Sequence, residues 1–290
     1  MCRLFGFRSV IPSQVHSSLV SAENALMVQS EEHPDGWGVA YYVARAPHVI
    51  KSADGAVNDQ LFKHVSGIVS SETVLAHVRR ATHGELSIIN SHPFQYGNWV
   101  FAHNGNIPDF SEHREQLAAQ ISPIMRRFIL GSTDSEVLFY LLLGNMARRF
   151  DLHRDGYPIA ELVSAIRETL DQVVEVTGLD WTDPDNEFYL TFIITNGQTM
   201  AAHQGGKELF FSTYKKSCPE RDSCPSYAPE CEAASKTGFV SHFLVSSEPL
   251  QGQNVWIELD PGQIVGVDWR MRYSEYGVGC EEPSHAIAHG

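Results

Sequence analysis

The chain has 290 residues, of which 43% are hydrophobic, 10% aromatic and 19% charged. This length and composition are typical of a globular protein with a large buried core, and they exclude a disordered or fibrous chain. Lys and Arg number 21 against 35 Asp and Glu, for a formal net charge of −14, so nucleic acid and anionic membrane surfaces are disfavoured as partners. The sequence also lacks the apolar run of about 18 residues that a membrane-spanning helix requires.

Strand patterns dominate the first hundred residues. Runs rich in aromatic and β-branched residues predict four strands there. Between them, Leu19–Val28 repeats apolar residues at helical spacing and predicts a helix. The predicted strands are Arg3–Arg8, Gly38–Val43, Val74–Arg79 and Trp99–His103.

Two longer helices are predicted in the middle of the chain, at Ser135–Phe150 and Ile159–Val176. Thr133 and Glu136 form a Thr-x-x-Glu capping box at the start of the first. Strand patterns then return at Glu187–Thr195, Glu208–Thr213, Phe239–Ser246 and Gln263–Trp269. Strands at both ends of the chain around central helices indicate an α+β fold rather than a doubly wound parallel sheet.

The segment Lys215–Lys236 interrupts the later strands with three cysteines, three prolines and almost no aliphatic residues. It is too long and irregular for a simple connection, which predicts either a functional lid or a mobile excursion. The residues after this segment are too few for a second domain, so residues 1–290 are predicted to form a single domain, with a short extension after about residue 250.

Cysteine usage predicts a reducing compartment. The chain has five cysteines, and its N-terminal apolar stretch is too short for a secretory signal, so we expect a cytoplasmic protein with free thiols. Cys218, Cys224 and Cys231 lie close in sequence but lack the C-x-x-C pairs of a zinc site. No metal site is therefore predicted.

The second residue carries the first chemical signal. Cys2 is small enough that the initiator Met1 is normally removed, which would leave Cys2 with a free α-amine. One residue would then hold a thiol nucleophile and an amine base with a pKa of about 7.7–8.0. The alternative is that Cys2 merely begins a buried strand.

Residues 76–84 read Ala-His-Val-Arg-Arg-Ala-Thr-His-Gly, a strand that ends in arginine and enters a turn. Arg79 can offer a guanidinium fork to a substrate carboxylate; the alternative is a surface salt bridge. For His77 and Arg80 we expect structural roles, as a hydrogen-bonded core histidine and a surface salt bridge respectively.

Two further motifs allow a structural and a functional interpretation. Asn104-Gly105 is the usual signal of a hairpin turn, or else the Asn104 amide and the Gly105 N–H form an oxyanion hole. Asp134, in the first turn of a predicted helix, either favours the helix dipole or binds a substrate ammonium.

The order of these motifs resembles the class II glutamine amidotransferases, which belong to the N-terminal-nucleophile hydrolases. The family pattern H-x-R-x-A-T-H-G, N-x-H-P, H-N-G and T-D-S/T-E appears in register at residues 77–84, 90–93, 103–105 and 133–136. The resemblance covers at least residues 2–150, and Val245-Ser246-Ser247-Glu248 extends it to about residue 250.

The resemblance implies a four-layer αββα sandwich and a reaction at the γ-carbonyl of glutamine or a γ-glutamyl compound. Cys2 would be the nucleophile that forms a thioester, and Asn104 and Gly105 would form the oxyanion hole. Water would then release glutamate. No metal or organic cofactor is implied.

The resemblance also implies how the glutamyl group is bound. Arg79 would bind its α-carboxylate, with Thr82 and His83 beside it, and Asp134 would bind its α-ammonium. Arg80 stands where the sugar-phosphate amidotransferases have Trp, and residues 35–38 read D-G-W-G in place of their D-S-A-G. Both departures are more similar to the small stand-alone branch, which includes γ-glutamyl hydrolases of glutathione breakdown and ergothioneine synthesis.

Other interpretations remain open. The segment after Glu248 is too short for a second active site, so the chain is expected either to hydrolyse a small γ-glutamyl substrate alone or to deliver ammonia to a separate protein partner. An inactive binding subunit would have no need of the intact motif series. A metallohydrolase could use four histidines of this chain, His77, His83, His92 and His103. The sequence lacks the H-x-H and H-E-x-x-H spacings that are typical of such metal sites.

Overall fold

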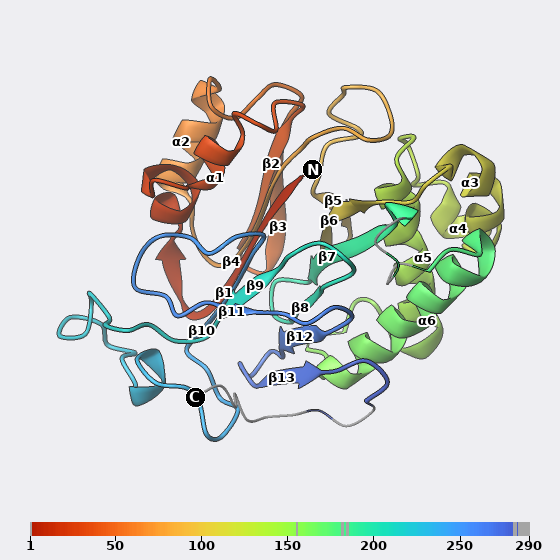
Figure 1. The fold of residues 1–290 in the computed structure, drawn as a ribbon. Coiled ribbons are helices and arrows are strands. Elements are labelled where there is room, and N and C mark those ends of the chain that lie inside the picture. Colours follow the sequence, from red (N-terminus) through yellow and green to blue (C-terminus); the bar gives the residue numbers. More distant parts are fainter. Residues whose placement is uncertain (1, 155, 181–182, 184–185, 281–282, 284–290) are drawn as a thin grey trace.

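Two antiparallel sheets face each other at the centre of the computed structural model, which describes residues 2–154, 156–180, 183, 186–280 and 283 (Figure 1). The seven-stranded sheet has the order β11 (Ile257–Glu258), β9 (Phe210–Ser212), β10 (His242–Ser246), β1 (Arg3–Gln14), β4 (Ser70–Val78), β2 (Trp37–Val43) and β3 (Ala46–Ser52). The six-stranded sheet has the order β13 (Tyr273–Tyr276), β12 (Ile264–Val267), β8 (Met200–His203), β7 (Tyr189–Thr195), β6 (Trp99–Asn106) and β5 (Phe94–Tyr96).

Helices cover the outer face of each sheet (Figure 1). The seven-stranded sheet carries a π-helix (Ser17–Ser21), α1 (Leu26–Gln29) and α2 (Gln60–Ile68). The six-stranded sheet carries α3 (Phe110–Ala119), α4 (Pro123–Arg126), α5 (Asp134–Arg149) and α6 (Ile159–Thr177). None of the helices in the described ranges is both long and apolar enough to cross a bilayer. The four layers confirm the predicted α+β fold, an αββα sandwich.

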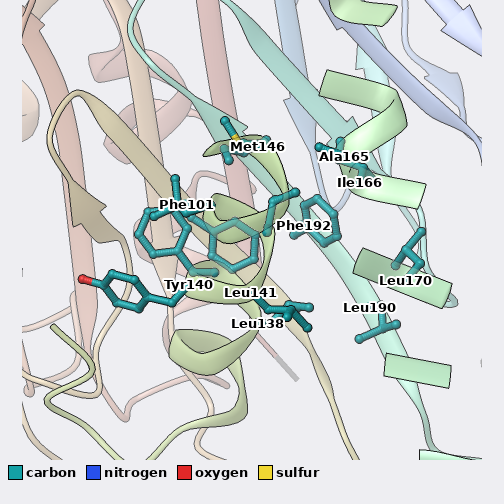
Figure 2. Packing of buried hydrophobic residues seen from close by; sticks show 14 of the residues in the cluster. Phe101, Leu138, Tyr140, Leu141, Met146, Ala165, Ile166, Leu170, Leu190 and Phe192 are labelled. Atoms are coloured by element: carbon teal, nitrogen blue, oxygen red, sulfur yellow. The ribbon is translucent and has the colours of Figure 1, made fainter. Parts of the chain in front are cut away.

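Three clusters of buried apolar side chains hold the layers together. One lies between the sheets and includes Leu4 of β1 and Ile193 of β7. A second packs α5 and α6 against the six-stranded sheet (Figure 2), where the Phe101 ring lies 5.2 Å from both Phe139 and Phe192, measured between centroids. The third packs the N-terminal helices against the other sheet. Each layer is therefore fixed by apolar burial on its inner side.

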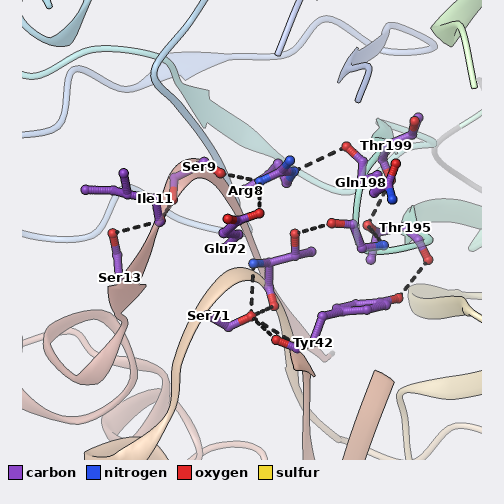
Figure 3. A network of polar contacts seen from close by, with 12 residues as sticks. Arg8, Ser9, Ile11, Ser13, Tyr42, Ser71, Glu72, Thr195, Gln198 and Thr199 are labelled. Carbon is purple, nitrogen blue, oxygen red and sulfur yellow. Dashed lines mark hydrogen bonds and ion pairs between the residues drawn. The ribbon is translucent and has the colours of Figure 1, made fainter. Parts of the chain in front are cut away.

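A polar network joins the sheets at one end (Figure 3). Arg8 of β1 donates from Nε to the Gln198 carbonyl at 3.2 Å, and Thr73 of β4 donates to the Gly197 carbonyl at 2.7 Å. The Tyr42 hydroxyl of β2 lies 3.2 Å from the Thr195 carbonyl. Three strands of one sheet are thus bonded to the β7–β8 turn of the other. The relative position of the sheets is fixed at the end opposite Cys2.

The two long predicted helices are present as α5 and α6, but only half of the predicted capping box forms. Thr133 Oγ1 accepts the Glu136 N–H at 3.3 Å, as an N-cap does. The Glu136 carboxylate accepts instead from the N–H groups of Leu130 at 3.0 Å and Gly131 at 2.6 Å. Its role is to hold the loop that enters α5.

The predicted helix at Leu19–Val28 is wrong as a single element. The chain is extended at Ala22, between the π-helix and α1. Asn24 explains the interruption, because its side chain donates to the Pro249 carbonyl at 2.8 Å and accepts from the Gln251 N–H at 3.0 Å. A tertiary contact therefore overrides the helical periodicity.

The segment Lys215–Lys236 is irregular, as predicted, with one 3₁₀ turn at Pro229–Cys231. Glu232 organises it: the carboxylate accepts the Cys218 N–H at 2.7 Å and the Tyr227 hydroxyl at 3.0 Å. It also lies 3.3 Å from the Arg221 guanidinium. The segment thus has its own polar centre.

The position of this segment rules out one of its expected roles. It connects β9 to the start of β10, where His242 pairs with Ser9 of β1, whereas the end of β10 pairs with Phe5 near Cys2. The segment therefore leaves the sheet at the end opposite Cys2 (Figure 1). A lid formed by this segment would therefore not lie over Cys2.

Burial makes His242 a contributor to pH-dependent stability. Desolvation, followed by the nearby Lys215 charge, lowers the pKa of His242 to about 3. In the unfolded chain His242 has a pKa near 6.5 and becomes protonated below that pH, whereas in the folded protein it stays neutral down to about pH 3. The free energy of unfolding therefore falls as the pH drops from about 6.5 towards 3. When the pH is lowered from 7 to 5, the free energy of unfolding should decrease in both proteins. The decrease should be about 1–2 kcal/mol smaller in His242→Leu than in the wild type. Urea denaturation at both pH values measures this; equal losses in the two proteins would contradict it.

Candidate active site

Cys2 lies where three strands of one sheet meet. It directly precedes β1, and Val78 at the end of β4 pairs with both Arg3 of β1 and Trp37 of β2. The Cys2 side chain is 8% exposed, and its Sγ lies 3.3 Å from the Arg80 N and 3.4 Å from the Arg80 O. Burial raises the pKa of the Cys2 thiol, although the Arg80 main chain and the Arg79 charge lower it. Reaction at this thiol therefore needs a nearby base.

The segment before β2 closes one side of the Cys2 position. The Asp35 N–H donates to the Arg79 carbonyl at 3.1 Å, and the Arg79 N–H donates to the Gly36 carbonyl at 2.8 Å. Asp35 Oδ2 also accepts the Ala81 N–H at 2.8 Å. Gly36 has φ +128°, where a side chain would be strained. The D-G-W-G motif thus fixes the course of residues 79–81.

The Arg79 guanidinium is buried rather than placed in a surface salt bridge, so that alternative is wrong. It donates to the carbonyls of His83 at 2.8 Å and Glu85 at 3.3 Å. These bonds use two of its five side-chain N–H groups. The buried fork can still bind a carboxylate, and it also holds the loop that carries Thr82 and His83.

Thr82 and His83 lie on this loop but differ in their surroundings. Thr82 is exposed, whereas His83 is half-buried, with its ring centroid 5.9 Å from that of Phe110. The structure therefore places both beside Arg79 in the chain. Neither side chain contacts Cys2 among the hydrogen bonds of the described residues.

Asn104 and Gly105 lie within β6, so the alternative of a hairpin turn is wrong. They pair with Thr191 and Leu190 of β7. A Cβ on Gly105 would lie 2.0 Å from His103 Nε2 and 2.2 Å from the Tyr189 carbonyl oxygen, so only glycine fits. His103 is itself fixed, with Nδ1 2.9 Å from Ser135 Oγ. The end of this strand is held tightly between β7 and α5.

Asp134 joins the end of β6 to the start of α5. Its carboxylate is 2% exposed and accepts the N–H groups of Ile107 at 2.9 Å and Ser135 at 2.7 Å. Burial lowers the pKa of Arg79, and the Cys2 thiol and Asp134 partly offset this, while Asp134 adds to the rise that burial causes in the pKa of the Cys2 thiol. The three charged or ionisable side chains therefore act on one another within one region.

Sequence reasoning assigned no role to two residues that hold the surrounding loops. Asn90 donates to the Glu85 carbonyl at 3.0 Å and accepts the Ser132 N–H at 3.0 Å, and so links the loop after Arg79 to the loop before Asp134. Lys51 of β3 donates to the Ser91 carbonyl at 2.8 Å. Burial lowers its pKa to about 8, partly offset by Glu136. Asn90 stands in the N-x-H-P motif, which was the available signal.

The four histidines of the metallohydrolase interpretation are not gathered as ligands. Across the described residues, no three His, Cys, Asp or Glu side chains form a group suited to a metal ion. The His77 and His92 rings lie 4.2 Å apart between centroids and are tilted by 39°, and burial lowers the pKa of His77 to about 3. Their ring nitrogens have no hydrogen-bond partner in the described chain. His77 is therefore buried in the core, as expected, but the hydrogen bond expected of its ring is not found among the described residues.

A groove of about 800 Å³ lies beside this region, between the segment preceding β2 and the one following β3. Its lining includes the carboxylates of Glu31, Asp54 and Asp59. None of the predicted site residues lines it.

Comparison with known proteins points to one family. Residues 1–271 match the model of the family described as Glutamine amidotransferases class-II. Over 227 residues the chain is 31% identical to Probable glutamine amidotransferase DUG3 from Saccharomyces cerevisiae, covering 69% of this chain and 62% of that protein. The chain therefore spans less than two thirds of this relative's length.

Two further relatives differ in coverage. Gamma-glutamyl-hercynylcysteine sulfoxide hydrolase from Mycobacterium tuberculosis is 33% identical over 115 residues, covering 36% of this chain and 49% of that protein. The solved structure of a glutamine aminotransferase class-II domain protein from Silicibacter pomeroyi superposes with a TM-score of 0.61 at 22% identity, covering 95% of this chain and 98% of that one. The latter match bears on the fold alone.

Proposed function

The chain belongs to the class II glutamine amidotransferases, and from this premise we propose that it hydrolyses γ-glutamyl amide bonds through a thioester on Cys2. The family membership supports an amidohydrolase-type activity. The γ-glutamyl substrate class is suggested by one relative, which is named as a hydrolase of a γ-glutamyl compound.

The observation that carries the proposal is the convergence of different elements on the Cys2 thiol. Sγ packs against the Arg80 main chain, and the buried Arg79 and Asp134 charges both shift the pKa of the thiol. Arg79 follows β4 in one sheet, whereas Asp134 begins α5 and bonds to the chain just after β6 in the other. A cation and an anion near one nucleophile fit the zwitterionic head of a glutamyl group.

In the proposed reaction the α-amine of Cys2, freed by removal of Met1, accepts the thiol proton. The thiolate attacks the γ-carbonyl carbon, and the side-chain amide of Asn104 and the N–H of Gly105 stabilise the oxyanion. The amine returns the proton to the leaving nitrogen as the C–N bond breaks. Water then attacks the thioester, which releases glutamate and restores the thiol.

A hydrolysis panel tests this proposal. Glutamine, glutathione, γ-glutamyl-cysteine and simple γ-glutamyl amides are incubated with the enzyme, and glutamate is measured. We expect glutamate from at least one of them without added metal or cofactor. A clear preference for glutamine would favour ammonia supply to another protein, and no glutamate from any compound would contradict the proposal.

A further inference from the structure

Arg80 has a side chain that the proposed reaction does not use. Its main-chain N and O lie 3.3 and 3.4 Å from Cys2 Sγ, yet its side chain is exposed. The surface salt bridge expected for it is absent: within the described part of the chain, the Arg80 guanidinium has no ion pair or hydrogen bond. The residue whose main chain contacts the Cys2 thiol therefore carries an unpaired cation.

The side of the site on which Arg80 lies follows from the course of the chain. The two side chains that directly follow β4 differ in burial. Arg79 is buried and turned inward, where it is proposed to bind the glutamyl head, whereas Arg80 is turned out to solvent. The leaving amine must depart away from the glutamyl head. Arg80 is therefore on the leaving-group side of Cys2.

Two arginines adjoin Cys2, and they differ in their partners. Arg3 lies beside Cys2, with its Nη1 3.4 Å from the Cys2 carbonyl, but its Nε is paired with Glu248 at 3.0 Å. Burial first, then the charges of Arg3 and Arg80, lower the pKa of the buried His33 to about 4. Asp35 raises the pKa of the same histidine, so charges of both signs act there. Of the two guanidiniums, only that of Arg3 has a carboxylate partner among the described residues.

We propose that Arg80 binds a carboxylate on the leaving amine, so that the preferred substrates are γ-glutamyl amino acids rather than glutamine. The inference rests on the proposed function. It concerns recognition of the leaving amine, the part of the substrate that Arg79 and Asp134 are not proposed to contact. In a γ-glutamyl amino acid the second carboxylate is one carbon away from the leaving nitrogen. A guanidinium on the residue that contacts Sγ is well placed to pair with it.

The test compares γ-glutamylglycine with γ-glutamylglycinamide, which differ only in that carboxylate, and with glutamine. Arg80→Gln should lower kcat/KM for γ-glutamylglycine about tenfold. This loss lies between the small loss expected when an exposed ion pair is removed and the larger loss expected for a desolvated one. The values for γ-glutamylglycinamide and glutamine should change by less than about twofold. Arg80→Lys should recover part of the loss. Arg127→Gln, which removes the same charge from an exposed arginine after α4, is the matched control and should change none of the three.

Salt gives an independent readout. Raising the ionic strength should lower the wild-type preference for γ-glutamylglycine over γ-glutamylglycinamide and leave Arg80→Gln unaffected. Equal losses on all three substrates in Arg80→Gln, or no loss on any, would overturn the inference while leaving the hydrolase proposal standing. No hydrolysis of any γ-glutamyl compound by the wild type would overturn the proposed function and this inference with it.

Discussion

Cys2→Ala is expected to reduce hydrolysis of every γ-glutamyl substrate by at least about 10⁴-fold and to leave the protein folded. The thiol is the only group that bonds to the γ-carbonyl carbon in the proposed reaction, so no thioester can form without it. The Cys2 Sγ bonds only to the main chain of Arg80 among the described residues, and loss of one sulfur atom should cost about 1 kcal/mol of unfolding free energy. Glutamate release and urea denaturation measure the two effects.

The matched control is Cys231→Ala, which removes another buried free thiol from the 3₁₀ turn at the opposite end of the sheet. Its activity should stay within about twofold of the wild type.

Active wild-type protein should also lack Met1 by intact mass, because a peptide nitrogen at residue 2 is not basic. Appreciable turnover by Cys2→Ala, or by protein that retains Met1, would remove Cys2 from the nucleophile role.

The elements that were predicted well are those whose local pattern and tertiary packing agree. α5 and α6 have apolar residues at helical spacing, and both bury these residues against the six-stranded sheet. β1, β4 and β6 are nearly continuous buried runs, which is typical of strands covered on both faces. The α+β class followed from their order along the chain.

Three of the strands that were missed have weak local patterns. β3 is an edge strand with mostly half-buried residues, and its Pro47 and Lys51 are poor strand signals. β8 and β13 have only four residues each, too few to show a period. In each case pairing with a neighbouring strand decides the structure. Sequence periodicity alone does not contain that information.

The candidate site shows the same division. Motif spacing singled out Cys2, Arg79 and Asp134, which the structure brings into one region. It did not reveal that Asn90 bridges the loops on either side of this region, because that depends on hydrogen bonds to residues 85 and 132. It also assigned a surface salt bridge to Arg80, where the structure shows an exposed side chain with no ion pair among the described residues, on a residue whose main chain contacts Sγ. The sequence gives the type of each side chain, but the residues that each side chain contacts depend on the fold.

Arg79→Lys and Asp134→Asn are each expected to lower kcat/KM by about 30- to 4,000-fold, since breaking one partner of a desolvated charge pair costs about 2–5 kcal/mol. Arg79→Lys keeps the charge and loses the fork that binds a carboxylate. Asp134→Asn keeps the size and one acceptor oxygen for the N–H groups of Ile107 or Ser135. Both replacements are therefore milder than alanine for the fold, and urea denaturation should show losses below about 2 kcal/mol.

The decisive feature is the pattern of these losses across substrates. Arg79 and Asp134 are proposed to contact only the glutamyl head, so each variant should lose the same factor on glutamine, γ-glutamylglycine and γ-glutamylglycinamide. Most of the loss should appear in KM, because the head contacts are made before the amide bond is attacked. Arg80→Gln should instead lower kcat/KM for the substrate whose leaving group carries a carboxylate and leave the values for the other two nearly unchanged. If Asp134→Asn separates these substrates more strongly than Arg80→Gln does, Asp134 lies on the leaving-group side and the proposed orientation of the substrate across Cys2 is wrong.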